Sequence, residues 1–298
     1  MGAHEVMPAL QNEEKAAVAV NRLAARLAAA GIEESQLKAE WAAAHVLGCP
    51  RLALRLQAER MMSPSSAAQL AALGDRLARG EPLQYVLGVS EFYGREFRVD
   101  PRALVPRPET EELVELAVKI SKGWNVAEGA VADVGTGSGC IAVTMALERS
   151  GLRVYATDPS AEALALAREN AARHGVESRI TFLRGSGLTP LATTMLDLVV
   201  SNPPYIASSA LAELPRDVRD YEPRQALDGG PDGLQVIAQV IRESADRLRP
   251  DGMILLEIGE DQEVRVVSLL ASAGFRGATV RCDVAGHPRF AMGTQPDV

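Results

Sequence analysis

One segment of this sequence combines polar acceptors with a rigid backbone: Asn202-Pro203-Pro204-Tyr205, which follows a run of apolar β-forming residues at 196–200. The run predicts a buried strand, and the prolines end it because they cannot donate to a neighbouring strand. Each proline also restricts the residue before it to extended backbone angles. The segment therefore either only terminates a strand or holds polar acceptors in place for a ligand.

A second candidate segment reads Gly135-Thr136-Gly137-Ser138-Gly139 and also follows a predicted strand. Glycines let the backbone turn sharply and approach a ligand, and a following helix offers unpaired N–H groups. The usual dinucleotide fingerprint has its third glycine one residue later, where this chain has cysteine. A loop that only lets a helix pack on a strand is the alternative.

Asp158 ends the next predicted strand, 19 residues after Gly139. A carboxylate at this place can accept hydrogen bonds from both hydroxyls of a ribose. Together with the glycine-rich loop, it indicates a nucleoside site. The alternative is that Asp158, followed by Pro159 and Ser160, caps the next helix, and both roles can hold at once.

These segments lie where strand-like and helix-like stretches alternate. We expect strands at 130–134, 153–157, 180–184, 196–201 and 253–259, helices from about 139 and 160, and a helix ending near 273. The alternation predicts an α/β fold with a doubly wound, mostly parallel, Rossmann-like sheet. In such a fold ligands bind at the carboxyl ends of strands, where the candidate residues lie.

The N-terminal part has a different character. Residues 13–79 are rich in Ala, Leu, Arg and Glu, and their apolar residues recur three and four apart, which predicts a small domain of about four helices. In residues 82–105, β-formers flank Gly88 and Gly94, which suggests a β-hairpin. We therefore predict a helical domain at 1–80, a β-hairpin linker at 81–105 and an α/β domain at 106–298.

Composition sets further limits. The 298 residues are 47% hydrophobic, enough to fill a core. Their net charge of −8 argues against sequence-independent binding to the phosphates of nucleic acid. Three distant cysteines and four scattered histidines have no metal spacing, so no metal is predicted. The chain shows no signal peptide and no apolar run of membrane-spanning length, so a cytoplasmic protein that does not enter the membrane is expected.

Several motifs resemble one enzyme family. DVGTGSG, TDPS and LDLVVSNPPYI resemble the class I S-adenosylmethionine-dependent methyltransferases. EFYGREF, VPRPETEELVE, YEPRQALDGGPDGL and LEIGEDQ are similar to the release factor glutamine methyltransferases, called PrmC or HemK. The resemblance covers about residues 80–293, and a helical N-terminal domain with a hairpin linker is also similar to that family.

The resemblance implies methylation of the amide nitrogen (N5) of the glutamine in the Gly-Gly-Gln motif of class-1 peptide chain release factors. S-adenosyl-L-methionine would be the cofactor and S-adenosyl-L-homocysteine the product. Residues 1–80 would dock the release factor, and the enzyme would act as a monomer without direct nucleic acid. The implied cofactor-binding residues are Asp133, Gly135, Thr136, Gly137, Ser138, Gly139, Asp158 and Asn202. The implied catalytic and substrate-binding residues are Asn202, Pro203, Pro204 and Tyr205.

The chemistry of an amide nitrogen fits this assignment. The nitrogen is a poor nucleophile because its lone pair is delocalised into the carbonyl. The side-chain oxygen of Asn202 and the backbone carbonyl of Pro203 can each accept one N–H, which aims the lone pair at the methyl group, and Tyr205 can stack on the amide. Such orientation is worth roughly 7 to 11 kcal/mol in favourable intramolecular reactions.

Other functions remain open at this point. An exocyclic base amine is also planar with two N–H groups, so a nucleic-acid amino-methyltransferase is the alternative enzyme. A catalytically silent cofactor-binding module is the alternative outside enzymes. Where the family has an acidic residue and often an aromatic one near the adenine, this chain has Ser186 and Gly187, so adenine contacts cannot be transferred. Glu257 either faces the site or is a buried, satisfied carboxylate.

Five further residues admit two interpretations each. Phe92 or Phe97 either caps the reactive amide or packs as a buried hairpin aromatic. Arg107, Glu109 and Glu111 either line the site or form a helix-entry cluster around Pro108.

Overall fold

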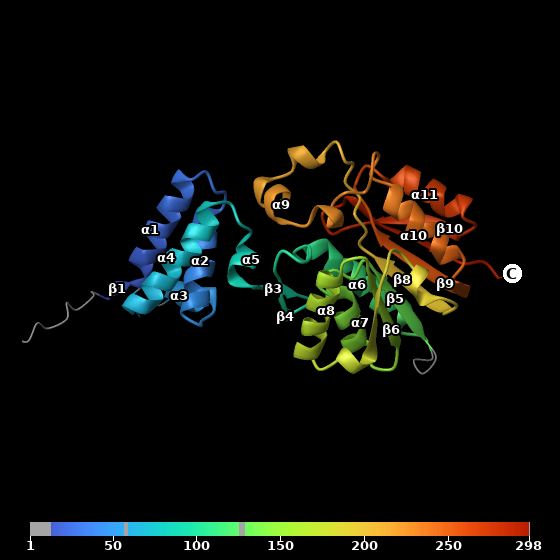
Figure 1. The fold of residues 1–298 in the computed structure, drawn as a ribbon, viewed down its shortest axis with the longest axis horizontal. Helices are drawn as coiled ribbons and strands as arrows, with labels where there is room; N and C mark the ends of the chain where they lie inside the picture. Colours follow the sequence, from blue (N-terminus) through green and yellow to red (C-terminus); the bar gives the residue numbers. More distant parts are fainter. Residues whose placement is uncertain (1–12, 57–58, 125–128, 298) are drawn as a thin grey trace, which may run out of the picture. The chain divides into compact units, whose positions relative to one another are not determined.

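The protein is described by a computed structural model over residues 13–56, 59–124 and 129–297 (Figure 1). Contacts divide the chain into two compact units, the first ending at Leu87 and the second beginning at Gly88. Within the described ranges, no helix is both long enough and apolar enough to cross a bilayer. His4 lies outside the described residues.

The N-terminal unit is helical. Its elements are α1 (Ala16–Ala29), α2 (Ser35–Val46), α3 (Arg51–Leu56), α4 (Pro64–Ala78) and α5 (Leu83–Leu87), with a short β1–β2 pair (Glu14–Lys15 and Met61–Met62). Between residues 13 and 79, apart from residues 57 and 58, the structure describes four helices, the number expected. Leu27 and Leu77 are fully buried in its core. Helices α1 and α4 approach closely at Gly74, where a Cβ atom would lie 2.5 Å from the Leu23 side chain.

The hairpin begins only after Gly88. It consists of β3 (Val89–Phe92) and β4 (Arg95–Arg98), joined at Tyr93 and Gly94, whose φ angles are 53° and 68°. Two consecutive residues with positive φ make the turn type that suits a two-residue hairpin. The β-formers at 83–87 are the helix α5 rather than a strand, because Pro82 starts a helical turn and Gly88 with positive φ ends it.

The second unit is built on a seven-stranded sheet. Its strands are β5 (Ala130–Val134), β6 (Arg153–Asp158), β7 (Ile180–Arg184), β8 (Leu196–Ser201), β9 (Leu248–Glu257), β10 (Arg276–Cys282) and β11 (Pro288–Thr294). The order is β10-β11-β9-β8-β5-β6-β7. All neighbours are parallel except for β11, which is antiparallel to both β9 and β10. The predicted α/β class with a mostly parallel sheet is confirmed.

Helices cover both faces of this sheet (Figure 1). One face carries α6 (Pro108–Ser121), α7 (Cys140–Glu148) and α8 (Ala161–Arg173), and the other carries α10 (Gln235–Ala245) and α11 (Glu263–Ser272). Alternate residues of the central strands divide between the two cores, because strand side chains point to opposite faces. Val131 and Leu198 pack on the α6–α8 side, whereas Ala132 and Val199 pack on the other.

The five expected strands are all present, and β9 starts earlier than expected, at Leu248. Helices begin at Cys140 and Ala161 and end at Ser272, each within two residues of expectation. The antiparallel pair β10–β11 was not expected. At the edge of the sheet β10 is largely exposed and has no continuous buried run, whereas β11 has four consecutive buried residues, Phe290 to Gly293.

Candidate active site

The strand order reverses beside β5. Its neighbour β6 is the next strand in sequence, whereas its other neighbour β8 is the third strand after it. Ligands bind at such a reversal. The glycine-rich loop leaves the carboxyl end of β5, and Asn202 follows the carboxyl end of β8. A hydrogen bond joins these ends, because the Ser201 hydroxyl donates to the Val134 carbonyl at 2.6 Å.

A cavity opens at this edge of the sheet and encloses about 1070 Å³, counting the space at its mouth that is open to solvent. Its walls come from several segments of the second unit, so residues far apart in sequence meet around one space. They are residues 102–107 with Thr110, residues 134–138 with Cys140 and Ile141, Asp158 with Pro159 and Ala163, Ser186 with Gly187, Ser201 to Pro204, Pro223 with Gln225 and Ala226, and Val236 with Val240 of α10.

The glycine-rich loop contributes Gly135, Thr136, Gly137 and Ser138 to the cavity wall. Its three glycines have φ angles of 75°, 54° and 83°, a region that other residues rarely adopt. Gly139 is not among the residues that line the cavity, and its role is in helix packing. A Cβ atom there would lie 3.0 Å from the Cβ of Ala167, so this glycine lets α7 approach α8.

Asp133 is fully buried beneath the loop and is not among the residues that line the cavity. Its Oδ2 accepts from the Thr136 hydroxyl at 2.6 Å and from the Ala142 N–H at 3.0 Å. No described residue donates to Oδ1. Burial raises the pKa of Asp133 to about 7. In this structure the carboxyl group ties the loop to the first turn of α7.

Asp158 lines the cavity at the end of β6. Its Oδ2 accepts from the Gly137 N–H at 3.0 Å, and its Oδ1 accepts from the Ser160 N–H at 2.9 Å. Burial raises the pKa of this carboxyl group. The cap of α8 is Ser160, whose hydroxyl accepts from the Ala163 N–H at 3.1 Å. Asp158 therefore supports the turn before the helix without being its cap.

The rigid segment after β8 brings Asn202, Pro203 and Pro204 to the cavity. No described residue donates to the Pro203 carbonyl, which leaves this acceptor free. The Tyr205 side chain is not among the described lining residues and packs against the α10–α11 core instead. Burial raises the pKa of its hydroxyl to about 12. Its backbone carbonyl accepts from the side-chain nitrogen of Gln262 at 3.0 Å.

Thr110 is a cavity residue that the sequence analysis did not identify. It lies in the first turn of α6, and the Asn202 side-chain nitrogen donates to its hydroxyl oxygen at 3.0 Å. The Thr110 hydroxyl donates to Glu257 Oε2 at 2.7 Å. Burial raises the pKa of Glu257, which ends β9, to about 7. No local pattern in the sequence marks this threonine.

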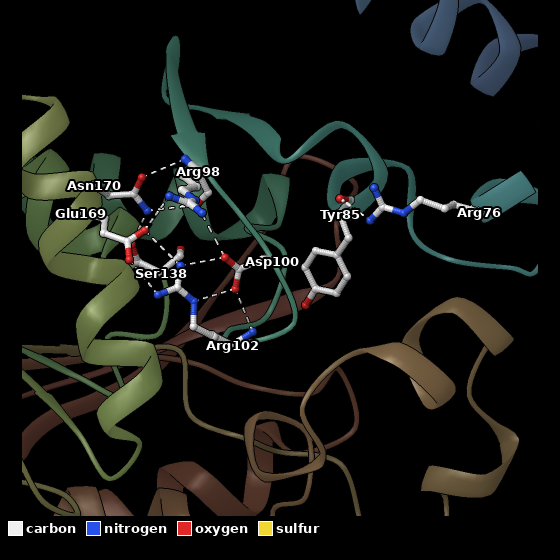
Figure 2. Close-up of polar contacts among 8 residues, drawn as sticks. All are labelled: Arg76, Tyr85, Arg98, Asp100, Arg102, Ser138, Glu169 and Asn170. Carbon is white, nitrogen blue, oxygen red and sulfur yellow. Dashed lines mark hydrogen bonds and ion pairs between the residues drawn. The ribbon is translucent and has the colours of Figure 1, made fainter. Parts of the chain in front are cut away.

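Asn170 of α8 joins the hairpin to the glycine-rich loop (Figure 2). Its side chain accepts from the Arg98 N–H at 2.7 Å and donates to the carbonyls of Arg98 at 3.0 Å and Ser138 at 2.8 Å. Next to it, the Arg102 guanidinium binds both Asp100 and Glu169. These contacts hold residues 102–105 as one wall of the cavity.

The two interpretations of Arg107 and the two phenylalanines can now be compared. Arg107 lines the cavity and binds the buried carboxylate of Glu222 at 2.7 Å. Phe92 and Phe97 extend from the hairpin into the core on the α6–α8 side of the sheet, where both are fully buried. Their rings meet edge to face at 5.9 Å, and neither lines the cavity. They are hairpin core residues.

Glu109 and Glu111 occupy the first turn of α6, as expected of a helix-entry cluster. Within residues 13–56, 59–124 and 129–297, no group of three or more His, Cys, Asp or Glu is arranged to hold a metal ion.

At the far end of the cavity, α10 supplies the polar groups around Ser186 and Gly187. The Gln239 side-chain nitrogen donates to Ser186 Oγ at 3.0 Å and to Glu243 Oε1 at 2.8 Å. Glu243 Oε2 accepts from the Leu188 N–H at 2.6 Å. A carboxylate is therefore present beside this loop, but it comes from a helix more than 50 residues later in the chain.

Known families match both parts of the chain. Residues 19–88 match the PrmC N-terminal domain, and residues 115–214 match the methyltransferase small domain. The release factor glutamine methyltransferase of Nitratidesulfovibrio vulgaris is 43% identical over 268 residues, which cover 89% of this chain and 90% of that protein. That of Moorella thermoacetica is 44% identical over 269 residues, with 89% and 93% covered.

This chain belongs to the release factor glutamine methyltransferase family. Solved structures agree in fold. The hMettl16 catalytic domain in complex with MAT2A 3'UTR hairpin 6 has a TM-score of 0.53 at 15% identity and covers 80% of this chain and 86% of its own. The T. thermophilus 16S rRNA N2 G1207 methyltransferase, in complex with AdoMet and guanosine, has a TM-score of 0.50 at 16% identity, covering 70% and 49%. For this family member they establish the class I methyltransferase fold alone.

Proposed function

We propose that this family member methylates the N5 amide nitrogen of the glutamine in the Gly-Gly-Gln motif of class-1 peptide chain release factors. One observation carries the proposal: the glycine-rich loop with Asp158 and the segment Asn202 to Pro204 open onto the same cavity. A site for a nucleoside and a pair of fixed acceptors for a planar N–H₂ group therefore share one space. Family membership supports the same substrate class.

The residues of the cavity fit S-adenosyl-L-methionine. The Asp158 carboxylate would accept from the ribose hydroxyls, and the loop from Gly135 to Ser138 would lie against the methionine part. The apolar wall formed by Val236 and Val240, together with Ser186 and Gly187, suits the adenine. Bound there, the cofactor supplies a methyl group activated by its sulfonium charge.

The substrate amide would be oriented by two acceptors. The Asn202 side-chain oxygen and the Pro203 carbonyl would each accept one N–H, so that the nitrogen lone pair points along the remaining direction. The nitrogen would take the methyl group as the bond between that carbon and the sulfonium sulfur breaks, and it would release one proton to water. S-adenosyl-L-homocysteine would remain. Tyr205 would contribute through its backbone, whose carbonyl is fixed by Gln262, since its ring packs into the core.

We further propose the following division of labour. Residues 1–80 dock the release factor, residues 81–105 form the hairpin linker, and residues 106–298 carry the chemistry. The enzyme acts in the cytoplasm as a monomer and needs no nucleic acid. The structure-based unit boundary after Leu87 gives a truncation point for testing the docking role.

The test uses the full chain, methyl-labelled cofactor and a purified release factor. We expect one label on the glutamine of the Gly-Gly-Gln loop, located by peptide mass spectrometry. Changing that glutamine to asparagine withdraws the nitrogen by one methylene and should abolish labelling. Label in RNA instead would favour the amino-methyltransferase of nucleic acid, and cofactor binding without any transfer would favour the silent module.

A further inference from the structure

Three side chains from three separate elements form a chain of hydrogen bonds at the site. Asn202 follows β8, Thr110 lies in the first turn of α6, and Glu257 ends β9. The Asn202 side-chain nitrogen lies 3.0 Å from the Thr110 hydroxyl oxygen, and that oxygen lies 2.7 Å from Glu257 Oε2. Thr110 is 3% exposed and Glu257 1%, so water does not compete for these contacts.

The direction of these bonds follows from the number of protons available. An ionised carboxylate only accepts, so the single hydroxyl proton of Thr110 goes to Glu257. Toward Asn202 the hydroxyl oxygen can then only accept, and the group that faces it must be the N–H₂ of the asparagine amide. The amide oxygen lies on the opposite side, and no described residue donates to it.

We propose that Thr110 and Glu257 are positioning residues that fix the rotation of the Asn202 amide, so that its oxygen faces the nitrogen to be methylated. This inference rests on the proposed function. Asparagine has no intrinsic preference between its two ends, which are nearly equal in shape. If the amide turned over, its N–H₂ would face the substrate N–H₂, donor against donor, and the nitrogen would lose one of its two acceptors.

The decisive variant is Thr110→Val, which keeps the β-branched shape and removes the hydroxyl. We expect its kcat for release factor methylation to fall about tenfold or more, because a neutral orienting hydrogen bond is lost in the transition state. The KM for the release factor and the affinity for S-adenosyl-L-homocysteine should stay close to wild type. Thr110→Ser retains the hydroxyl and should restore most of kcat.

Thr144→Val is the matched control. Thr144 is also fully buried, on α7, but its hydroxyl has no partner among the described residues. This variant should keep wild-type kcat and should not melt at a lower temperature. It separates loss of the positioning hydroxyl from the general effect of a buried threonine-to-valine change.

Glu257→Gln provides a second test that does not touch Thr110. A glutamine amide can donate to the Thr110 oxygen as well as accept from it, so both rotations of Asn202 become possible and kcat should fall by less than in Thr110→Val. Wild-type kcat in Thr110→Val, or a loss that Thr110→Ser does not restore, overturns the inference. A wild-type enzyme that labels no release factor instead overturns the proposed function, before any variant is compared.

Discussion

One guanidinium nitrogen of Arg107 binds both carboxylate oxygens of Glu222, each at 2.7 Å, across 115 residues of sequence. The Glu222 side chain is 1% exposed, whereas that of Arg107 is 33% exposed. Burial raises the pKa of Glu222, and the Arg107 charge opposes this rise. The pair joins the start of α6 to the segment that brings Pro223, Gln225 and Ala226 to the cavity wall.

This asymmetry predicts unequal effects of removing either partner. Arg107→Met leaves a buried carboxylate without its counter-charge and should lower the free energy of unfolding by about 3 kcal/mol at pH 8. Glu222→Gln leaves an arginine that water can reach and should cost less. At pH 5 the Arg107→Met penalty should shrink, since a carboxyl whose folded pKa is raised stabilises the fold at low pH and loses that contribution as pH rises. Urea titration of the wild type and both variants at pH 8 and pH 5 measures these free energies. An Arg107→Met penalty that is the same at the two pH values would contradict the prediction.

Asp158→Ala should weaken S-adenosyl-L-homocysteine binding by about 10- to 100-fold, the loss expected for charge-assisted hydrogen bonds of about 1.5 to 3 kcal/mol. Ser160→Ala is the control, because Ser160 does not itself line the cavity. The change removes only the cap of α8, in which the Ser160 hydroxyl accepts from the Ala163 N–H, and should cost about 1 kcal/mol of stability. Calorimetric titration of both variants decides between the roles. Similar affinities in the two variants would reduce Asp158 to a support of the turn.

Asn202→Ala should bind S-adenosyl-L-homocysteine nearly as well as the wild type and lose most methyl transfer, because the lost acceptor orients the substrate nitrogen. Asn202→Asp keeps an acceptor but adds a charge that must be desolvated beside the sulfonium, so only partial activity is expected. Single-turnover transfer rates measured with saturating cofactor test this. An active Asn202→Ala enzyme would remove the residue from the chemistry.

Gly139→Ala should destabilise the second unit by about 2 kcal/mol, through positive φ and contact with Ala167. The double variant Gly139→Ala, Ala167→Gly removes the Cβ–Cβ contact at 3.0 Å. The approach to the Ala167 Cα at 3.1 Å, the backbone strain and the helix cost of glycine remain. The two changes should therefore cost less together than their sum. Additive losses in thermal unfolding would show that α7 and α8 shift apart without strain.

The Glu257 carboxylate predicts a pH dependence of methyl transfer. Burial raises its pKa to about 7, Thr110 and the charges of Arg289 and Arg107 oppose the rise, and Glu109 adds to it. Ionised Glu257 fixes the Asn202 amide, so kcat should fall as pH drops through about 7.

The free energy of unfolding should change with pH in the opposite direction from kcat. The folded state binds the Glu257 proton more tightly than the unfolded chain does, and the stability that this provides is lost as pH rises through about 7. A pH–rate profile of the wild type should show the inflection. In Thr110→Val, where Glu257 no longer acts on Asn202, the residual rate should not show it. The same inflection in both proteins would assign it to another group.

The parts of the fold that were predictable depend on neighbours in sequence. Strands 130–134 and 196–201 are mostly apolar, and they are followed by Gly135 and by Asn202-Pro203. Each is therefore predictable from its own residues and those next to it. The helix at Leu83–Leu87 was not, because Pro82 and Gly88 outweigh the β-propensity of the residues between them. Competing local signals of this kind are decided by a balance of small terms.

The residues of the site also fall into two groups, those that local sequence predicts and those that only long-range contacts bring together. Asp158 and Asn202 stand directly after strands, so the rule for parallel sheets placed them at the cavity. Thr110 meets Asn202 across 92 residues, and Asn170 meets Arg98 across 72, so no local spacing indicates either contact. Tyr205 was expected beside the substrate, but whether a side chain after two prolines faces a cavity or the core depends on the helices that cover it.

The place of β5 in the sheet affects the order in which the two sides of the site form while the chain is synthesised. Strands β5, β6 and β7 are consecutive in the chain and pair with one another, whereas β8 reaches β5 only after all of them have been made. A growing chain that has emerged as far as Arg184 contains the glycine-rich loop and Asp158 but no Asn202. We expect the glycine-rich loop and Asp158 to come together first on the ribosome. The amide-holding segment after β8 and the α10 wall of the cavity should join them in a second, slower event.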